Sequence, residues 1–145
     1  MKGCSTYKKE TNMKNLIVTL LMLLSVSSFS QQILTDDNFD AAINGRSAFQ
    51  DDNISIVVVE FWASFNDANS FSDWNKLKGV KYYKVDISKA PQAKKDHKVR
   101  TIPHIIVFLD GYDEKHFKAG LDFAIRDSWE DIQEIIDELL NESKF

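Results

Sequence analysis

Hydrophobic residues in this chain recur in short runs between polar turns, and the spacing within each run predicts its secondary structure. The run Ile54–Trp62 is rich in β-branched residues and alternates little, which is typical of a strand buried on both faces. Two further strands are predicted at Val80–Ile87 and Ile105–Leu109, and an Asp-Gly turn follows the second. Beyond that turn, Lys115–Leu121 is expected to return as an antiparallel strand.

Helical spacing separates these strands. A helix over Asp36–Asn44 follows a short apolar lead-in, and apolar residues at i, i+3 and i+6 predict a second helix over Asn69–Leu77. A short polar helix is expected over Ser88–His97. The last helix begins after Ser128, where Asp131 three residues on completes a weak capping box and an amphipathic stripe follows.

The order of these elements predicts the fold class. From residue 33 to about 142 the chain reads β-α-β-α-β-α-β-β-α, without an internal repeat. Alternating elements that end in a hairpin and a helix imply a mixed central sheet with helices on both faces. A length of 145 residues with 43% hydrophobic content fits one such α/β domain.

Residues 1–30 have a different character. Several lysines precede the apolar core Leu16–Leu24, and the small residues Ser28 and Ser30 follow, which predicts a secretory signal peptide cleaved after Ser30. The core is about half as long as a membrane span, so an anchor is the less favoured alternative and none is expected after cleavage. Met13 would begin a more compact signal, which leaves residues 1–12 as a candidate upstream extension. We therefore expect a domain over residues 31–145 that is periplasmic or secreted.

Cleavage changes both the charge and the sulfur content. The chain has 18 basic and 22 acidic residues, of which four and one lie in residues 1–30, so residues 31–145 carry a net charge of about −7. This balance argues against nucleic-acid binding, which needs a clustered basic face. The single cysteine, Cys4, and all three methionines also lie in residues 1–30. No glycine-rich phosphate loop or nucleophile elbow is present, and no cofactor is expected.

Several short motifs occur in an order that resembles the thioredoxin-like family. They are Glu60-Phe61-Trp62-Ala63-Ser64-Phe65, Lys84-Val85-Asp86, Pro91, Thr101-Ile102-Pro103, Asp110-Gly111 and Lys118-Ala119-Gly120. The resemblance covers residues 33 to about 142 and implies a thioredoxin-like fold with a cis peptide bond before Pro103.

The sequence departs from the family at the catalytic motif. Where thioredoxins carry Cys-Gly-Pro-Cys, this chain has Asn66-Asp67-Ala68-Asn69. Thiol–disulfide exchange needs an attacking thiolate and a second thiol to resolve the mixed disulfide, and asparagine offers neither. We therefore expect no catalytic residue and no oxidoreductase activity, although the family resemblance by itself would suggest that activity.

The resemblance also implies a groove and an ion pair. Thioredoxins lay an extended peptide against residues that correspond here to Trp62, Phe65, Ile102, Pro103, Ala119 and Gly120. Binding of this kind is strand addition and needs no thiol; the alternative is that these residues serve the fold alone. Glu60 and Lys84 correspond to the family's buried acid and its lysine partner, and are expected to form a buried ion pair.

Three histidines complete the candidate chemistry. His97, His104 and His116 lie far from one another in the sequence and from any paired acids, so structural roles are favoured over a metal site. The sequence thus predicts an exported thioredoxin-fold protein that is not an enzyme and that binds an extended polypeptide or protein partner. The alternative is a passive structural domain of a larger exported assembly.

Overall fold

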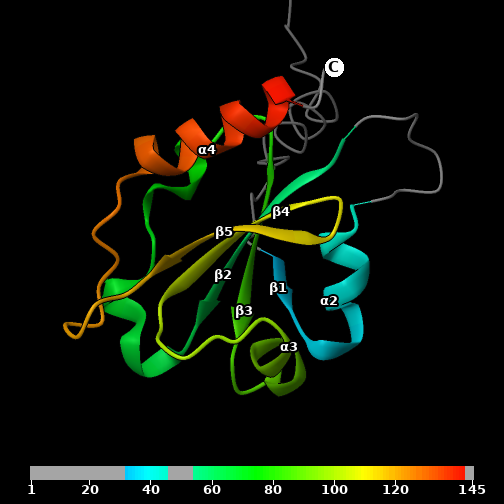
Figure 1. Ribbon diagram of the computed structural model, residues 1–145. Coiled ribbons are helices and arrows are strands. Elements are labelled where there is room, and N and C mark those ends of the chain that lie inside the picture. The colour runs from blue at the N-terminus through cyan, green and yellow to red at the C-terminus, as the bar shows by residue number, and fades with distance from the viewer. Residues whose placement is uncertain (1–31, 46–53, 143–145) are drawn as a thin grey trace, which may run out of the picture. The chain divides into compact units, whose positions relative to one another are not determined.

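The computed structural model describes residues 32–45 and 54–142 (Figure 1). The predicted signal peptide over residues 1–30 lies outside the described residues. None of the helices in the described part of the chain combines the length and apolar composition that a membrane crossing requires.

A five-stranded mixed sheet forms the centre of the domain. Its strands are β1 (Gln32–Leu34), β2 (Ile56–Trp62), β3 (Lys81–Asp86), β4 (His104–Leu109) and β5 (Tyr112–Lys118). Their spatial order is β1-β3-β2-β4-β5; the first three are parallel, and β4 and β5 are antiparallel (Figure 1). The central strand β2 is almost wholly buried, as its unbroken apolar run predicts.

Helices cover both faces of this sheet. They are α2 (Asp36–Ile43), α3 (Pro91–Asp96) and α4 (Trp129–Glu142). One apolar layer packs Phe39 of α2 against Phe61 and Phe108, whereas the other packs Ile132 and Ile136 of α4 on the opposite face. The capping box that starts α4 is present, because the Asp131 carboxylate accepts from Ser128 N–H and Asp131 N–H donates to the Ser128 hydroxyl. The predicted α/β architecture is confirmed.

The prediction of a helix over Asn69–Leu77 is wrong. Two short 3₁₀ segments, η1 (Ser64–Asn69) and η2 (Asp73–Lys76), take its place. Between them the backbone is extended at Ser70 (φ −61°, ψ 145°). The cause is local: the Ser70 hydroxyl and the Phe71 N–H both donate to the Glu60 carboxylate, which holds this part of the chain away from a continuous helix.

The last hairpin also differs from its prediction. Strand β5 begins directly after Gly111 and ends at Lys118, so it starts earlier and stops sooner than Lys115–Leu121. The Ile102–Pro103 peptide bond before β4 is cis, and the Pro103 carbonyl accepts from Ala119 N–H at 3.1 Å. Three parallel strands followed by an antiparallel β4–β5 hairpin make this a thioredoxin-like fold, and the end of β5 lies against the proline loop.

Candidate functional site

Asn66 stands at the first position that the resemblance assigns to a cysteine, just beyond the carboxyl end of β2. It is buried, and its Nδ2 donates to the Ile102 carbonyl at 3.1 Å and to the Phe123 carbonyl at 3.0 Å. Asn69, at the second cysteine position, donates its own Nδ2 to Asn66 Oδ1 at 2.7 Å. One amide therefore joins η1 to the proline loop and to the loop after β5.

This arrangement limits the chemistry of the position. A primary amide donates and accepts hydrogen bonds, but it supplies neither a nucleophile nor a group that titrates near neutral pH. Both N–H groups and the oxygen of Asn66 are engaged, so the side chain is held in one orientation. The Ile102 carbonyl, one of the backbone groups that strand addition would use, already accepts one hydrogen bond and keeps one lone pair.

The structure places the predicted groove residues at different depths. Ile102, Pro103 and Ala119 are buried, Trp62 and Gly120 are half-buried, and Phe65 is 79% exposed. The proline loop contacts Ala119 through the backbone and reaches Asn66, the neighbour of Phe65. Three of the predicted groove residues are therefore buried, and among the six only Phe65 is mostly exposed.

Two further exposed apolar side chains, which the sequence reasoning missed, belong to the loop after β5 that binds Asn66. Leu121 is fully exposed, and Phe123 is 52% exposed on the residue whose carbonyl Asn66 binds. Together with Phe65 they form what we call the apolar rim: Phe65, Leu121 and Phe123. These are three of the five large apolar side chains exposed in the described part of the chain. Leu121 was placed at the end of the predicted strand Lys115–Leu121, whereas β5 ends at Lys118 and leaves this residue in the loop.

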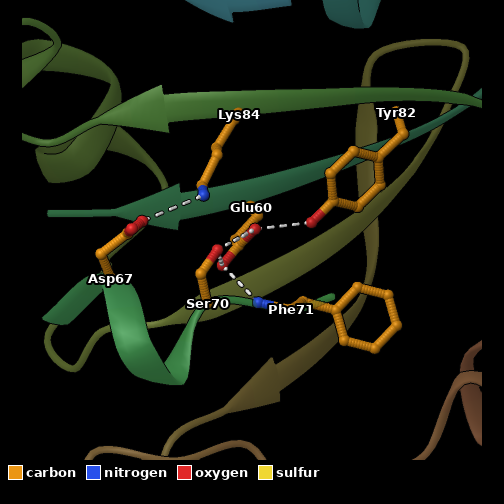
Figure 2. Close-up of polar contacts among 6 residues, drawn as sticks. All are labelled: Glu60, Asp67, Ser70, Phe71, Tyr82 and Lys84. Atoms are coloured by element: carbon orange, nitrogen blue, oxygen red, sulfur yellow. Dashed lines mark hydrogen bonds and ion pairs between the residues drawn. The ribbon is translucent and has the colours of Figure 1, made fainter. Parts of the chain in front are cut away.

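Glu60 is fully buried, but its partners differ from the prediction. Its carboxylate accepts from Ser70 Oγ at 3.0 Å, from Phe71 N–H at 3.0 Å and from the Tyr82 hydroxyl at 2.7 Å (Figure 2). Burial, and secondarily the neighbouring Glu60 charge, raise the pKa of Tyr82. The carboxylate is thus held by uncharged donors.

The predicted Glu60–Lys84 ion pair is therefore corrected. The two residues share a register position on β2 and β3, yet the Lys84 ammonium extends toward Asp67, 3.8 Å from its carboxylate, as Figure 2 shows. The same ammonium lies 4.6 Å from the centre of the Trp62 ring. Because three uncharged donors already hold Glu60, Lys84 pairs with an exposed acid at the strand end instead.

Two of the three histidines, distant in the sequence, lie against one carboxylate, and the third contacts one of these two. His97 Nδ1 lies 2.9 Å from Asp113, and His116 Nε2 lies 3.5 Å from the same side chain. His116 Nδ1 in turn contacts His104 Nε2 at 2.9 Å. We call this the histidine chain: His97, Asp113, His116 and His104. A cavity of about 500 Å³ borders its outer part, and no group of metal-ligating side chains in the described ranges is arranged to hold an ion.

Hydrogen bonding favours one arrangement of protons along the histidine chain. Asp113 accepts from both neighbours, so His97 carries its proton on Nδ1 and His116 on Nε2. His116 Nδ1 then accepts from His104 Nε2–H, which leaves His104 Nδ1 as a bare lone pair in the core. Burial, followed by the charges of His116 and Lys118, lowers the pKa of His104 to about 4, and burial lowers the pKa of His116.

Comparison with known proteins supports the fold and no narrower assignment. No protein-family model matches this chain. No curated protein matches it either. Among solved structures, a designed protein aligns with a TM-score of 0.55 and 21% identity, covering 77% of this chain and 98% of that one. A yeast mitochondrial 1-Cys peroxiredoxin aligns with a TM-score of 0.48 and 18% identity, over 61% of this chain and 83% of its own.

Proposed function

We propose that this chain is an exported thioredoxin-fold binding protein that holds an extended polypeptide segment at the apolar rim and the adjoining proline loop. The observation that carries the proposal is the apolar rim itself. All three side chains are exposed: Phe65 directly precedes the buried, fully engaged Asn66, Phe123 accepts a hydrogen bond from it, and Leu121 lies two residues before Phe123. Exposed apolar side chains that gather at one place are typical of a surface that a partner covers.

The size of this rim suits a moderate affinity. Burying one large apolar side chain contributes about 1.5–3 kcal/mol. Three such side chains contribute about 4.5–9 kcal/mol, and the loss of free motion on association offsets much of this gain, so backbone pairing must supply part of the affinity. The free lone pair of the Ile102 carbonyl leaves one acceptor for backbone pairing with the bound segment.

The same site supports recognition without thiol chemistry. Residues 31–145 contain no cysteine, and Asn66 and Asn69 bind each other and the neighbouring loops where an exchange reaction would need two thiols. An insulin-reduction assay is expected to show no turnover above a buffer blank. Turnover that scales with protein concentration would contradict this part of the proposal.

Capture of partners from a periplasmic extract tests the proposed binding of a polypeptide at the apolar rim. The wild-type chain is crosslinked in the extract beside Phe65→Ser and Phe123→Ser, and the captured proteins are identified by mass spectrometry. Tyr112→Ser is the matched control, because Tyr112 is an aromatic of similar exposure (75%) at the other end of β5. We expect the rim variants to lose partners that the control retains.

Two outcomes would count against the binding proposal. Identical partners for all four proteins would rule out the rim as the binding surface. An absence of any specific partner would leave the passive structural domain as the better description.

A further inference from the structure

A second surface, distinct from the rim, gathers positive charge around a cavity of about 470 Å³. We call it the cationic pocket. Its lining combines three apolar residues with four basic ones: Ile87, Pro91, Val99, Lys94, Lys95, Lys98 and Arg100. No acidic residue contributes to this lining.

The four basic side chains have no ionic partner in the described part of the chain. The two acids within residues 81–100 are not part of the lining: Asp86 accepts from Ser88, and Asp96 accepts from Gln92. The remaining charges of that stretch are all positive: Lys81, Lys84, Lys89, Lys94, Lys95, Lys98 and Arg100. In a domain whose net charge is about −7, this is a marked local reversal of sign.

Helix chemistry explains only part of this clustering. Lys94 and Lys95 lie in the last turn of α3, where the helix dipole favours cations. Lys98 and Arg100 lie beyond the helix. The chain turns at Lys98, which has a left-handed backbone (φ 54°), and this turn brings the two later cations to the cavity that Lys94 lines.

The cationic pocket adjoins the proposed binding groove. Ile87, in its lining, donates its backbone N–H to the Trp62 carbonyl at 3.0 Å. Arg100 stands two residues before Ile102, the residue that precedes the cis proline. A segment of a few residues laid along the proline loop can therefore reach the pocket.

We infer that the cationic pocket binds acidic side chains of the polypeptide held at the groove, so that the preferred partner is an apolar segment flanked by Asp or Glu. This inference rests on the proposed function and specifies its ligand. The apolar lining of Ile87, Pro91 and Val99 accommodates the methylene groups of Glu, and the cations meet the carboxylates. Because the pocket is open to solvent, added salt weakens the preference.

Three labelled peptides test the inference by fluorescence anisotropy with the full chain. They share one apolar centre of Leu, Phe and Val, and differ only in three flanking residues, which are Glu, Gln or Lys. At low ionic strength the Glu peptide is expected to bind about tenfold tighter than the Gln peptide, and the Lys peptide more weakly than either. The ratio is expected to shrink in high salt.

Two double variants, each of which removes two positive charges, test whether the preference for the Glu peptide depends on the cationic pocket. Lys98→Gln with Arg100→Gln is expected to bring the Glu peptide to the affinity of the Gln peptide. The control pair, Lys78→Gln with Lys115→Gln, removes two exposed lysines outside the pocket and is expected to keep most of the preference. Equal losses in both pairs would assign the effect to net charge and overturn the inference.

The remaining outcomes separate this inference from the proposed function. Equal binding of all three peptides, lost in Phe65→Ser, would keep the groove and overturn the acidic preference. Binding of no peptide would overturn both. Retention on phosphatidylglycerol vesicles that depends on Lys98 and Arg100, without any preference among the peptides, would reassign the pocket to a lipid surface and overturn the polypeptide assignment.

Discussion

Two buried polar networks lie on opposite faces of the sheet and are built on different principles. On the face that α4 covers, the Glu60 carboxylate accepts hydrogen bonds from three uncharged groups. On the face that α2 and α3 cover, the histidine chain passes from Asp113 inward to His104, whose Nδ1 has no partner among the described residues. The first network is closed around its acceptor, whereas the second ends in the core.

The difference concerns protons. Each donor to Glu60 keeps its proton at neutral pH, so that network needs no particular tautomer. Every link of the histidine chain requires a specific ring nitrogen to carry the proton. A proton added to His116 Nδ1 would face the N–H of His104, and His104 could turn its proton away only by placing it on the buried, unpartnered Nδ1. The second network is therefore the one expected to fail in acid.

Removal of the Glu60 carboxylate is expected to give the largest effect. Glu60→Ala leaves three buried donors without an acceptor and opens a cavity in the sheet. The free energy of unfolding is expected to fall by about 3–5 kcal/mol, because three uncharged donors lose their acceptor, each at a cost of about 1 kcal/mol or more, and the cavity adds to this. Urea unfolding followed by tryptophan fluorescence measures this change.

The control retains an acceptor at the same position. Glu60→Gln keeps one side-chain oxygen, and Tyr82→Phe in the same chain removes a donor that the amide cannot serve. The double variant is expected to lose less than half as much stability as Glu60→Ala. A loss below about 1 kcal/mol for Glu60→Ala would show that the carboxylate is not the centre of a stabilising network.

Acid is expected to produce the next largest effect, through His104. An unfolded histidine takes up its proton near pH 6.5, whereas the folded pKa of His104 is about 4. Below pH 6.5 the unfolded state therefore binds more protons than the folded state. The free energy of unfolding is highest above pH 6.5 and decreases as the pH falls toward 4. The loss amounts to about 3 kcal/mol over that window.

His104→Asn tests the assignment of this pH dependence. The carboxyls whose pKa is lowered, those of Asp86, Asp122 and Asp131, have an ordinary value of 3.8 and titrate below the window. The free energy of unfolding, measured at pH 7, 6, 5 and 4.5, is expected to depend less steeply on pH in the variant, and the lowered pKa of His116 accounts for the dependence that remains. Parallel pH profiles for the variant and the wild type would remove His104 as the cause.

Neutralising Asp113 gives a smaller change with a distinct signature. The Asp113 charge raises the pKa of both His104 and His116 against the lowering by burial. Asp113→Asn is expected to lower both pKa values further, and to destabilise the fold by about 1–2 kcal/mol at pH 7, because His97 and His116 then share a single uncharged acceptor. Histidine ring NMR titration measures the pKa values; an upward shift would show that the Asp113 charge does not raise them.

The sequence predicted one of these networks in part and the other not at all. The apolar run around Glu60 was enough to predict its burial, but its partners depend on Ser70 and Phe71, which a predicted helix had placed elsewhere. His104 and His116 are twelve residues apart and meet only through the β4–β5 register, which pairs Ile106 with His116. The predicted start of the return strand at Lys115 did not supply that register.

Lys84→Met is expected to have the smallest effect, and it tests whether the stability of the Glu60 network depends on a cation. Lys84 lies near Asp67, which is mostly exposed, and over the Trp62 ring, and methionine keeps most of the packing. The ion pair with the mostly exposed Asp67 and the cation–π contact are each worth about 1 kcal/mol or less, so a combined loss of at most about 2 kcal/mol is expected in urea unfolding. A loss of stability as large as that of Glu60→Ala would support the original prediction of an ion pair between Glu60 and Lys84. A small loss leaves Glu60 stabilised by three uncharged donors.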